Sequence, residues 1–381
     1  MSTRATPRAP RLDVDALLAD RHTHIVVCCG SGGVGKTTTA AALGLRAAEQ
    51  GRRVVVLTID PARRLAQSMG LTELDNSPRP VHDIDTAAGG SLDAMMLDMK
   101  RTFDEVVVAH STPEKADQIL ANPFYQAVSS SFAGTQEYMA MEKLGQLHAA
   151  AESEGHWDLI VVDTPPARSA LDFLEAPEHL SSLLDGRFLR LLLAPARGPL
   201  RLMSVGFNLV SAVMTKVLGA QVIRDVQTFV TAFEALFGGF RQRAASTFAL
   251  LSSRHTTFVV VATPQRDALR EAAYFVDRLT EEQMPLCGLV LNRVHTTALD
   301  ISPERALSLA EDLEPEAYPL EVEALRRHAS LMRLIGAEAR QMGRFSASRP
   351  AVAQTRVQSL PTDVTDLAAL RRVGDFLADK D

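Results

Sequence analysis

A glycine-rich loop decides the fold, and it reads Gly30-Ser31-Gly32-Gly33-Val34-Gly35-Lys36-Thr37-Thr38. Its first eight residues match the P-loop pattern G-x-x-x-x-G-K-[ST] in full. The apolar run before it (HIVVCC, 24–29) predicts a buried strand, and the Ala-rich run after it (37–50) predicts a helix that Gly51 ends. A strand, a glycine loop and a helix in this order favour an anion site over a structural glycine turn.

The loop predicts how a nucleoside triphosphate would be held. Glycines let the backbone come close to a ligand, so we expect the amides of residues 32–38 to converge on phosphate oxygens. The ammonium group of Lys36 is expected to reach the β- and γ-phosphates, and the hydroxyl of Thr37 to bind Mg²⁺. The predicted nucleotide-binding residues here are Gly30, Ser31, Gly32, Gly33, Val34, Gly35, Lys36, Thr37 and Thr38.

Short apolar runs elsewhere predict one mostly parallel sheet. The run at 53–59 completes a βαβ unit with the loop and its helix. Similar runs follow at 158–162, 257–262 and 288–292, and a weaker one lies at 92–98. We therefore expect an α/β fold, namely a P-loop NTPase with a doubly wound, mostly parallel sheet and an inserted α-helical subdomain.

Two long stretches without strand patterns predict the insertion. Residues 99–153 and 177–253 are assigned to this helical subdomain. Residues 1–20 are expected to form a tail and a short helix, and the stretch at 346–362 is expected to be loose. The nucleotide-binding α/β core is then assigned to residues 21–98, 154–176 and 254–381.

Two predicted strands end in a carboxylate. Asp163 ends DLIVVD, the pattern in which an acid holds Mg²⁺, often through water. Asp60 ends RVVVLTID and precedes a proline. Its carboxylate is a candidate to position or deprotonate the attacking water, and a turn-initiating Asp-Pro pair is the alternative.

These motifs together resemble one family. The loop variant GGVGKTT, TIDPA at 58–62 and VVDTPP at 161–166 are similar to the ArsA-type ATPases, which comprise arsenite-pump ATPases and the guided-entry ATPases that target tail-anchored proteins. The resemblance implies ATP hydrolysis in a dimer whose ATP sites face each other. It further implies that Asp60 orients the attacking water and that Asn292 contacts adenine, although a loop-capping Asn is the alternative for the latter.

Two switch loops of the family are altered here. The first usually reads DPAHN and here reads DPARR from Asp60. The second usually reads DTAPTGH, and here Arg168 and Ser169 replace its Gly and His, so its coupling to the γ-phosphate is open. The residues that the resemblance places in these loops are Pro61, Arg63, Arg64, Thr164, Pro165, Pro166 and Arg168.

Ser31 is the main departure from the family. Relatives usually carry a second lysine there, which reaches the partner's ATP and stabilises transition-state charge. Serine has no charge and is too short for that. The protein is then a slow ATPase, or Arg63, Arg64 or Arg168 substitutes, or the chain pairs with a lysine-bearing paralogue. We favour the heterodimer and keep a weakly active homodimer as the alternative.

Apolar stripes in the second helical stretch suggest a client groove. One stripe recurs at spacings of three and four, and a second lies upstream of it. The stripes either bury each other in a core or form a groove for a hydrophobic client. The candidate groove residues are Phe207, Met214, Val222, Val226, Phe229, Phe233, Leu236 and Phe240.

Composition narrows the possible roles. A net charge of −6 disfavours nucleic acid as a partner. The three cysteines include no Cys-x-x-Cys pair, which argues against a structural zinc site. They do not match the cysteine cluster with which the resembled arsenite pumps hold metalloid, nor the cysteines that bridge an iron–sulfur cluster in more distant relatives, so the resemblance disfavours arsenite transport and such a cluster. We expect a cytoplasmic protein without a transmembrane segment. Handling a hydrophobic client is the favoured role, and an ATP-gated interaction switch or the energising subunit of an anion or metalloid pump are the alternatives.

Overall fold

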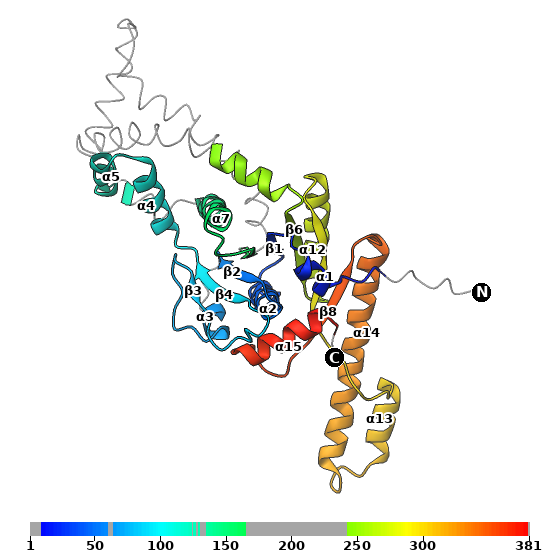
Figure 1. The fold of residues 1–381 in the computed structure, drawn as a ribbon. Helices are drawn as coiled ribbons and strands as arrows, with labels where there is room; N and C mark the ends of the chain where they lie inside the picture. Colours follow the sequence, from blue (N-terminus) through cyan, green and yellow to red (C-terminus); the bar gives the residue numbers. More distant parts are fainter. Residues whose placement is uncertain are drawn as a thin grey trace, which may run out of the picture. The chain divides into compact units, whose positions relative to one another are not determined.

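The computed structural model describes residues 9–59, 64–123, 125–126, 129, 135–164 and 242–379 (Figure 1). Several predicted residues fall outside this part of the chain or, for Arg64, have an undescribed side chain: Asp60, Pro61, Arg63, Pro165, Pro166, Arg168 and the candidate groove residues. The chain separates into two compact units, treated individually below. The first takes in Met1–Met96, Glu154–Ala170 and Leu251–Asp381, and the second Leu97–Ser153 and Leu171–Leu250.

The first unit is built on an eight-stranded sheet, which confirms the predicted fold class. Its strand order is β3-β4-β2-β5-β1-β6-β7-β8, and only the β3–β4 pair is antiparallel. Because β1 lies centrally between two parallel neighbours, the loop that follows it emerges at the carboxyl edge of the sheet. The strands are β1 Ile25–Cys29, β2 Arg53–Thr58, β3 Arg79–Pro80, β4 Ser91–Met96, β5 Leu159–Asp163, β6 Thr256–Ala262, β7 Leu286–Val294 and β8 Gln354–Gln358.

Helices cover this sheet, and α2 is the most deeply buried of them. Its Ala-rich sequence brings it close to the strands, and a Cβ on Gly44 would lie only 2.5 Å from a methyl group of Val56. Figure 1 shows α15 beside α2, in agreement with their packing. The helices of this unit are α1 Val14–Ala19, α2 Lys36–Glu49, α3 Arg64–Ser68, α12 Arg266–Glu281, α13 Pro303–Asp312, α14 Pro319–Ser348 and α15 Leu367–Leu377.

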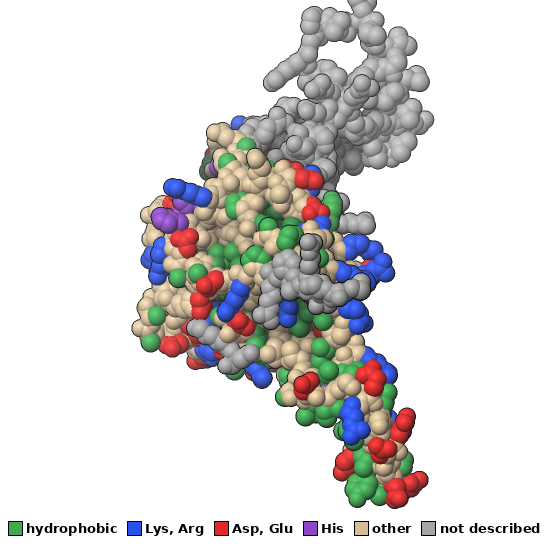
Figure 2. Space-filling view, turned by 90° about the vertical axis from the view of Figure 1, so that its right-hand side faces the viewer, with side chains coloured by type: hydrophobic (Ala, Val, Ile, Leu, Met, Phe, Trp, Pro, Cys, Tyr) green, Lys and Arg blue, Asp and Glu red, His purple; other side chains and the backbone are tan. Residues whose placement is uncertain are grey.

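The C-terminal part differs from the prediction. The stretch expected to be loose contains the end of α14 and the whole of β8, whose sequence QTRVQ carries only two buried side chains, Thr355 and Val357. Upstream of it, α13 and the first half of α14 form a hairpin that projects from the sheet (Figure 1). Figure 2 shows charged and hydrophobic side chains mixed over this projection, where Tyr318 and Leu320 are exposed.

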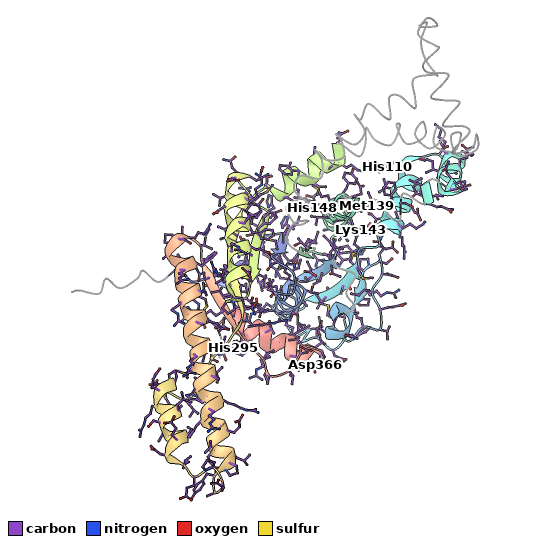
Figure 3. The ribbon with its side chains drawn as sticks, turned by 180° about the vertical axis from the view of Figure 1, so that it is seen from behind. His110, Met139, Lys143, His148, His295 and Asp366 are labelled. Carbon is purple, nitrogen blue, oxygen red and sulfur yellow. The ribbon has the colours of Figure 1, made fainter. Side chains whose placement is uncertain are left out.

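The second unit is helical in its described part. It contains α4 Met99–His110, α5 Pro113–Leu120 and most of α7 Thr135–Glu154. Met139 and Lys143 lie on α7 (Figure 3), and the Lys143 ammonium group pairs with Glu105 of α4 at 3.0 Å. The buried carboxylate of Glu142 accepts from Nε of Arg243 at 2.9 Å. Among all described residues, no helix is long and apolar enough to cross a membrane.

Candidate nucleotide site

The loop between β1 and α2 has a backbone that glycine alone accommodates at two points. Gly35 caps α2 with a φ of 93°, and an added Cβ would come within 2.2 Å of Nδ2 of Asn292. A Cβ on Gly30 would lie 2.1 Å from the carbonyl oxygen of Val261 on β6. The loop is therefore pressed against the ends of β6 and β7, which fixes its path.

Lys36 is the first residue of α2 and is folded back over the loop. Its side chain is buried, and Nζ donates a hydrogen bond to the backbone oxygen of Ser31 at 3.0 Å. The ammonium group thus lies inside the curve of the loop. A cation in this place, together with a helix N-terminus, favours a bound anion.

Thr37 and Asp163 meet at the carboxyl edge of the sheet. The Thr37 hydroxyl donates to Oδ2 of Asp163 at 2.6 Å, and the Thr58 hydroxyl donates to the same oxygen at 2.9 Å. Parallel pairing of β5 with β1 and β2 brings these residues together, since Asp163 is in register with both Cys28 and Thr58. A carboxylate beside a hydroxyl is a set of hard oxygen donors, so the residues present fit Mg²⁺.

Asn292, near the end of β7, holds the loop in place through a side-chain hydrogen bond. Its Nδ2 donates to the backbone oxygen of Val34 at 2.8 Å, and its Oδ1 accepts from the backbone N–H of Arg293 at 2.9 Å. The side chain is buried, so in this structure it binds the loop itself. Neither bond could be foreseen from the sequence, because they depend on how closely β7 approaches the loop.

Two pockets flank the loop. One of about 510 Å³ adjoins Gly35, Thr37 and Thr38 and is walled by Asn292 and by the segment 357–365 that ends β8 and follows it. The other, of about 480 Å³, adjoins residues 31–34 and is walled by the start of α12 and by the end of β7. The segment 357–365 was missed from the sequence because β8, which delivers it to this edge, was not recognised.

Comparison with known proteins decides the family. A family model described as Anion-transporting ATPase matches residues 23–302, which include the loop, Asp163 and Asn292. The chain belongs to the anion-transporting ATPase family. This confirms the predicted resemblance to ArsA-type ATPases.

Individual members of the family are similar to the chain over different lengths. The arsenical pump-driving ATPase of Acidiphilium multivorum is 30% identical over 41% of this chain, which covers only 26% of that relative. ATPase ASNA1 homolog 1 of Paramecium tetraurelia is 24% identical over 70% of this chain and 73% of its own length. ATPase GET3 of Malassezia globosa is 28% identical over 42% of this chain and 44% of its own length.

The cysteines of this family member are poorly suited to bind a soft metal or metalloid. Burial raises the pKa of the Cys29 thiol to about 12, and burial with the nearby Asp163 carboxylate raises the pKa of Cys28. Burial also raises the pKa of Cys287. Thiolate is the form that ligates such ions, and burial makes each of the three thiols harder to ionise.

Proposed function

We propose that this chain is a Mg²⁺-dependent ATPase that converts ATP and water to ADP and phosphate. The contact between Thr37 and Asp163 carries the proposal, because it joins the metal-binding hydroxyl and carboxylate beside a complete P-loop. The family comparison supports it, since the matched family is one of ATPases.

The loop residues bind and orient the triphosphate in this proposal. Backbone amides of residues 32–38 surround the phosphates, and Nζ of Lys36 exchanges the Ser31 oxygen for β- and γ-phosphate oxygens. Thr37 and Asp163 would hold Mg²⁺, which would supply positive charge that offsets the negative charge of the phosphates. Positioning and charge stabilisation are the main terms in such catalysis.

Asp60 is proposed to position the attacking water. It directly follows Ile59 in the sequence, and the backbone N–H of Ile59 donates to the backbone oxygen of Asp163 at 3.1 Å, so Ile59 lies at the edge of the sheet where Asp163 lies. A carboxylate there would accept a hydrogen bond from water and aim its lone pair at the γ-phosphate.

The base and ribose are proposed to occupy the 510 Å³ pocket. It adjoins the α2 side of the loop, and Leu360, Pro361 and Val364 offer apolar surface for a purine ring. Asn292 is at its wall, so the adenine contact that the resemblance implies requires the amide to serve the base as well as the loop.

Magnesium dependence tests the proposed enzyme. Asp163→Asn keeps the shape and the oxygen that accepts from Thr37 but removes the charge, so Mg²⁺-stimulated phosphate release should fall by about 100-fold. Metal-free nucleotide binding should change little. Asp366→Asn is the matched control, because Asp366 caps α15 through Ala369 N–H at 2.7 Å and asparagine caps equally well. Full Mg²⁺-dependent turnover in Asp163→Asn would refute the metal assignment.

For the biological role, we propose a nucleotide-driven dimer, preferably with a lysine-bearing paralogue, that binds or hands over a hydrophobic client or protein partner. The support is the family resemblance, the uncharged Ser31 and the apolar stripe that contains Phe229. The test is nucleotide-dependent capture of a transmembrane peptide, which Phe229→Asp should abolish without loss of fold. Capture that ignores nucleotide would favour an ATP-gated switch or another partner.

A further inference from the structure

The turn that ends β7 has a strained backbone held from both sides. Arg293 adopts a φ of 59°, in the left-handed region that is unfavourable for a non-glycine residue. Asn292 ties the turn to the loop through Val34, and its Oδ1 accepts from Arg293 N–H at 2.9 Å. On the other side, His295 donates its backbone N–H to the buried carboxylate of Glu338 on α14 at 3.0 Å (Figure 3).

This turn presents one guanidinium group beside the loop. Arg293 is exposed and lines both pockets, one of them together with Ser31 and the other together with Thr37. Within the described part of the chain its guanidinium has no hydrogen-bond or ion-pair partner. A strained backbone that places an uncommitted cation at a site is better explained by a ligand than by the fold.

A triphosphate needs more positive charge than the loop contains. Residues 30–38 carry one cation, Lys36, whereas ATP carries several negative charges. A guanidinium is planar and always charged, and its fork of donors matches phosphate oxygens. Three acidic side chains line the 480 Å³ pocket, Asp267, Glu271 and Glu338, and none of them makes a hydrogen bond or ion pair with Arg293 that would neutralise it.

We propose that Arg293 binds the phosphates of the nucleotide and is the second cation of this site. The inference rests on the proposed function and deepens it, because it assigns a charge that the loop lacks. It also predicts that the site senses the number of phosphates, since the ion pair strengthens with the charge of the ligand.

Affinities of the full chain for ATP, ADP and adenosine test this inference by titration calorimetry. Arg293→Asn is the informative variant, because asparagine tolerates the left-handed backbone while it removes the charge. It should weaken ATP binding by about 10-fold and ADP binding by less, and leave adenosine unchanged. Arg293→Lys should recover part of the loss. Arg356→Asn, an exposed arginine on the neighbouring β8 outside both pockets, should have no effect.

Two results would overturn the inference. One is ATP affinity in Arg293→Asn equal to that of the unchanged chain, and the other is an equal loss for all three ligands, which indicates a base contact or a structural role. Failure of the proposed function would differ from failure of this inference, because the unchanged chain would then bind no ATP at all. Matched thermal unfolding of the variants confirms that each is folded.

Discussion

At the scale of single residues, the path of the loop depends on glycines, which have no side chain. The left-handed φ at Gly35 and the closeness of Asn292 leave no room for a Cβ. The P-loop pattern predicted that these glycines let the backbone amides of the loop bind phosphate. It could not predict that the obstacle at Gly35 is the amide of Asn292, because that contact joins segments 257 residues apart in the chain.

Gly35→Ala should therefore damage the site and the fold together. The methyl group must displace Asn292 from Val34, and the left-handed backbone adds strain, so we expect about 1–3 kcal/mol less unfolding free energy and a clear loss of ATP affinity. Urea unfolding and calorimetry measure the two effects. The matched control is Gly343→Ala in α14, where an added Cβ meets nothing within 4 Å and helix propensity should add up to about 1 kcal/mol. Equal behaviour of the two variants would contradict the packing argument.

At the scale of elements, strands buried on both faces were predictable and edge strands were not. β1 and β2 are short unbroken apolar runs, and the structure places them within a residue of the prediction. β8 is polar at four of five positions, so its sequence cannot be separated from that of a loop. Because β8 was not predicted, the segment 357–365 that lines the 510 Å³ pocket was missed as well.

The positions of side chains were likewise predictable only where a motif names them. Thr37 and Asp163 were predicted to serve one metal from their motifs, and β-sheet register explains why they meet. Arg293 is part of the L-N-R stretch at 291–293 that shares the family resemblance, but the sequence assigned it no role. Its role became arguable only when the turn after Asn292 was seen to lie between two pockets.

At the scale of the whole molecule, the proposed dimer needs a cation that reaches from one protomer to the ATP of the other. Ser31 cannot provide one, so we predict slow ATP turnover by the pure chain and at least about a 10-fold increase when a lysine-bearing paralogue forms a one-to-one complex with it. Light scattering measures the mass of the complex, and phosphate release measures its rate of ATP turnover. Ser31→Lys should raise the rate of the chain alone. Fast turnover by a homodimer of the unchanged chain, or no gain from Ser31→Lys, would contradict the heterodimer.

The most direct test is the affinity of Lys36→Ala for Mg²⁺·ATP, measured by titration calorimetry on folded protein. We predict binding weaker by about 100-fold or more, equivalent to roughly 2.7 kcal/mol, because the ammonium group inside the loop is lost. Lys100→Ala, which removes an exposed lysine paired with Asp104 on α4, should bind as the unchanged chain does. Unaltered affinity in Lys36→Ala would show that the triphosphate is not held by this loop.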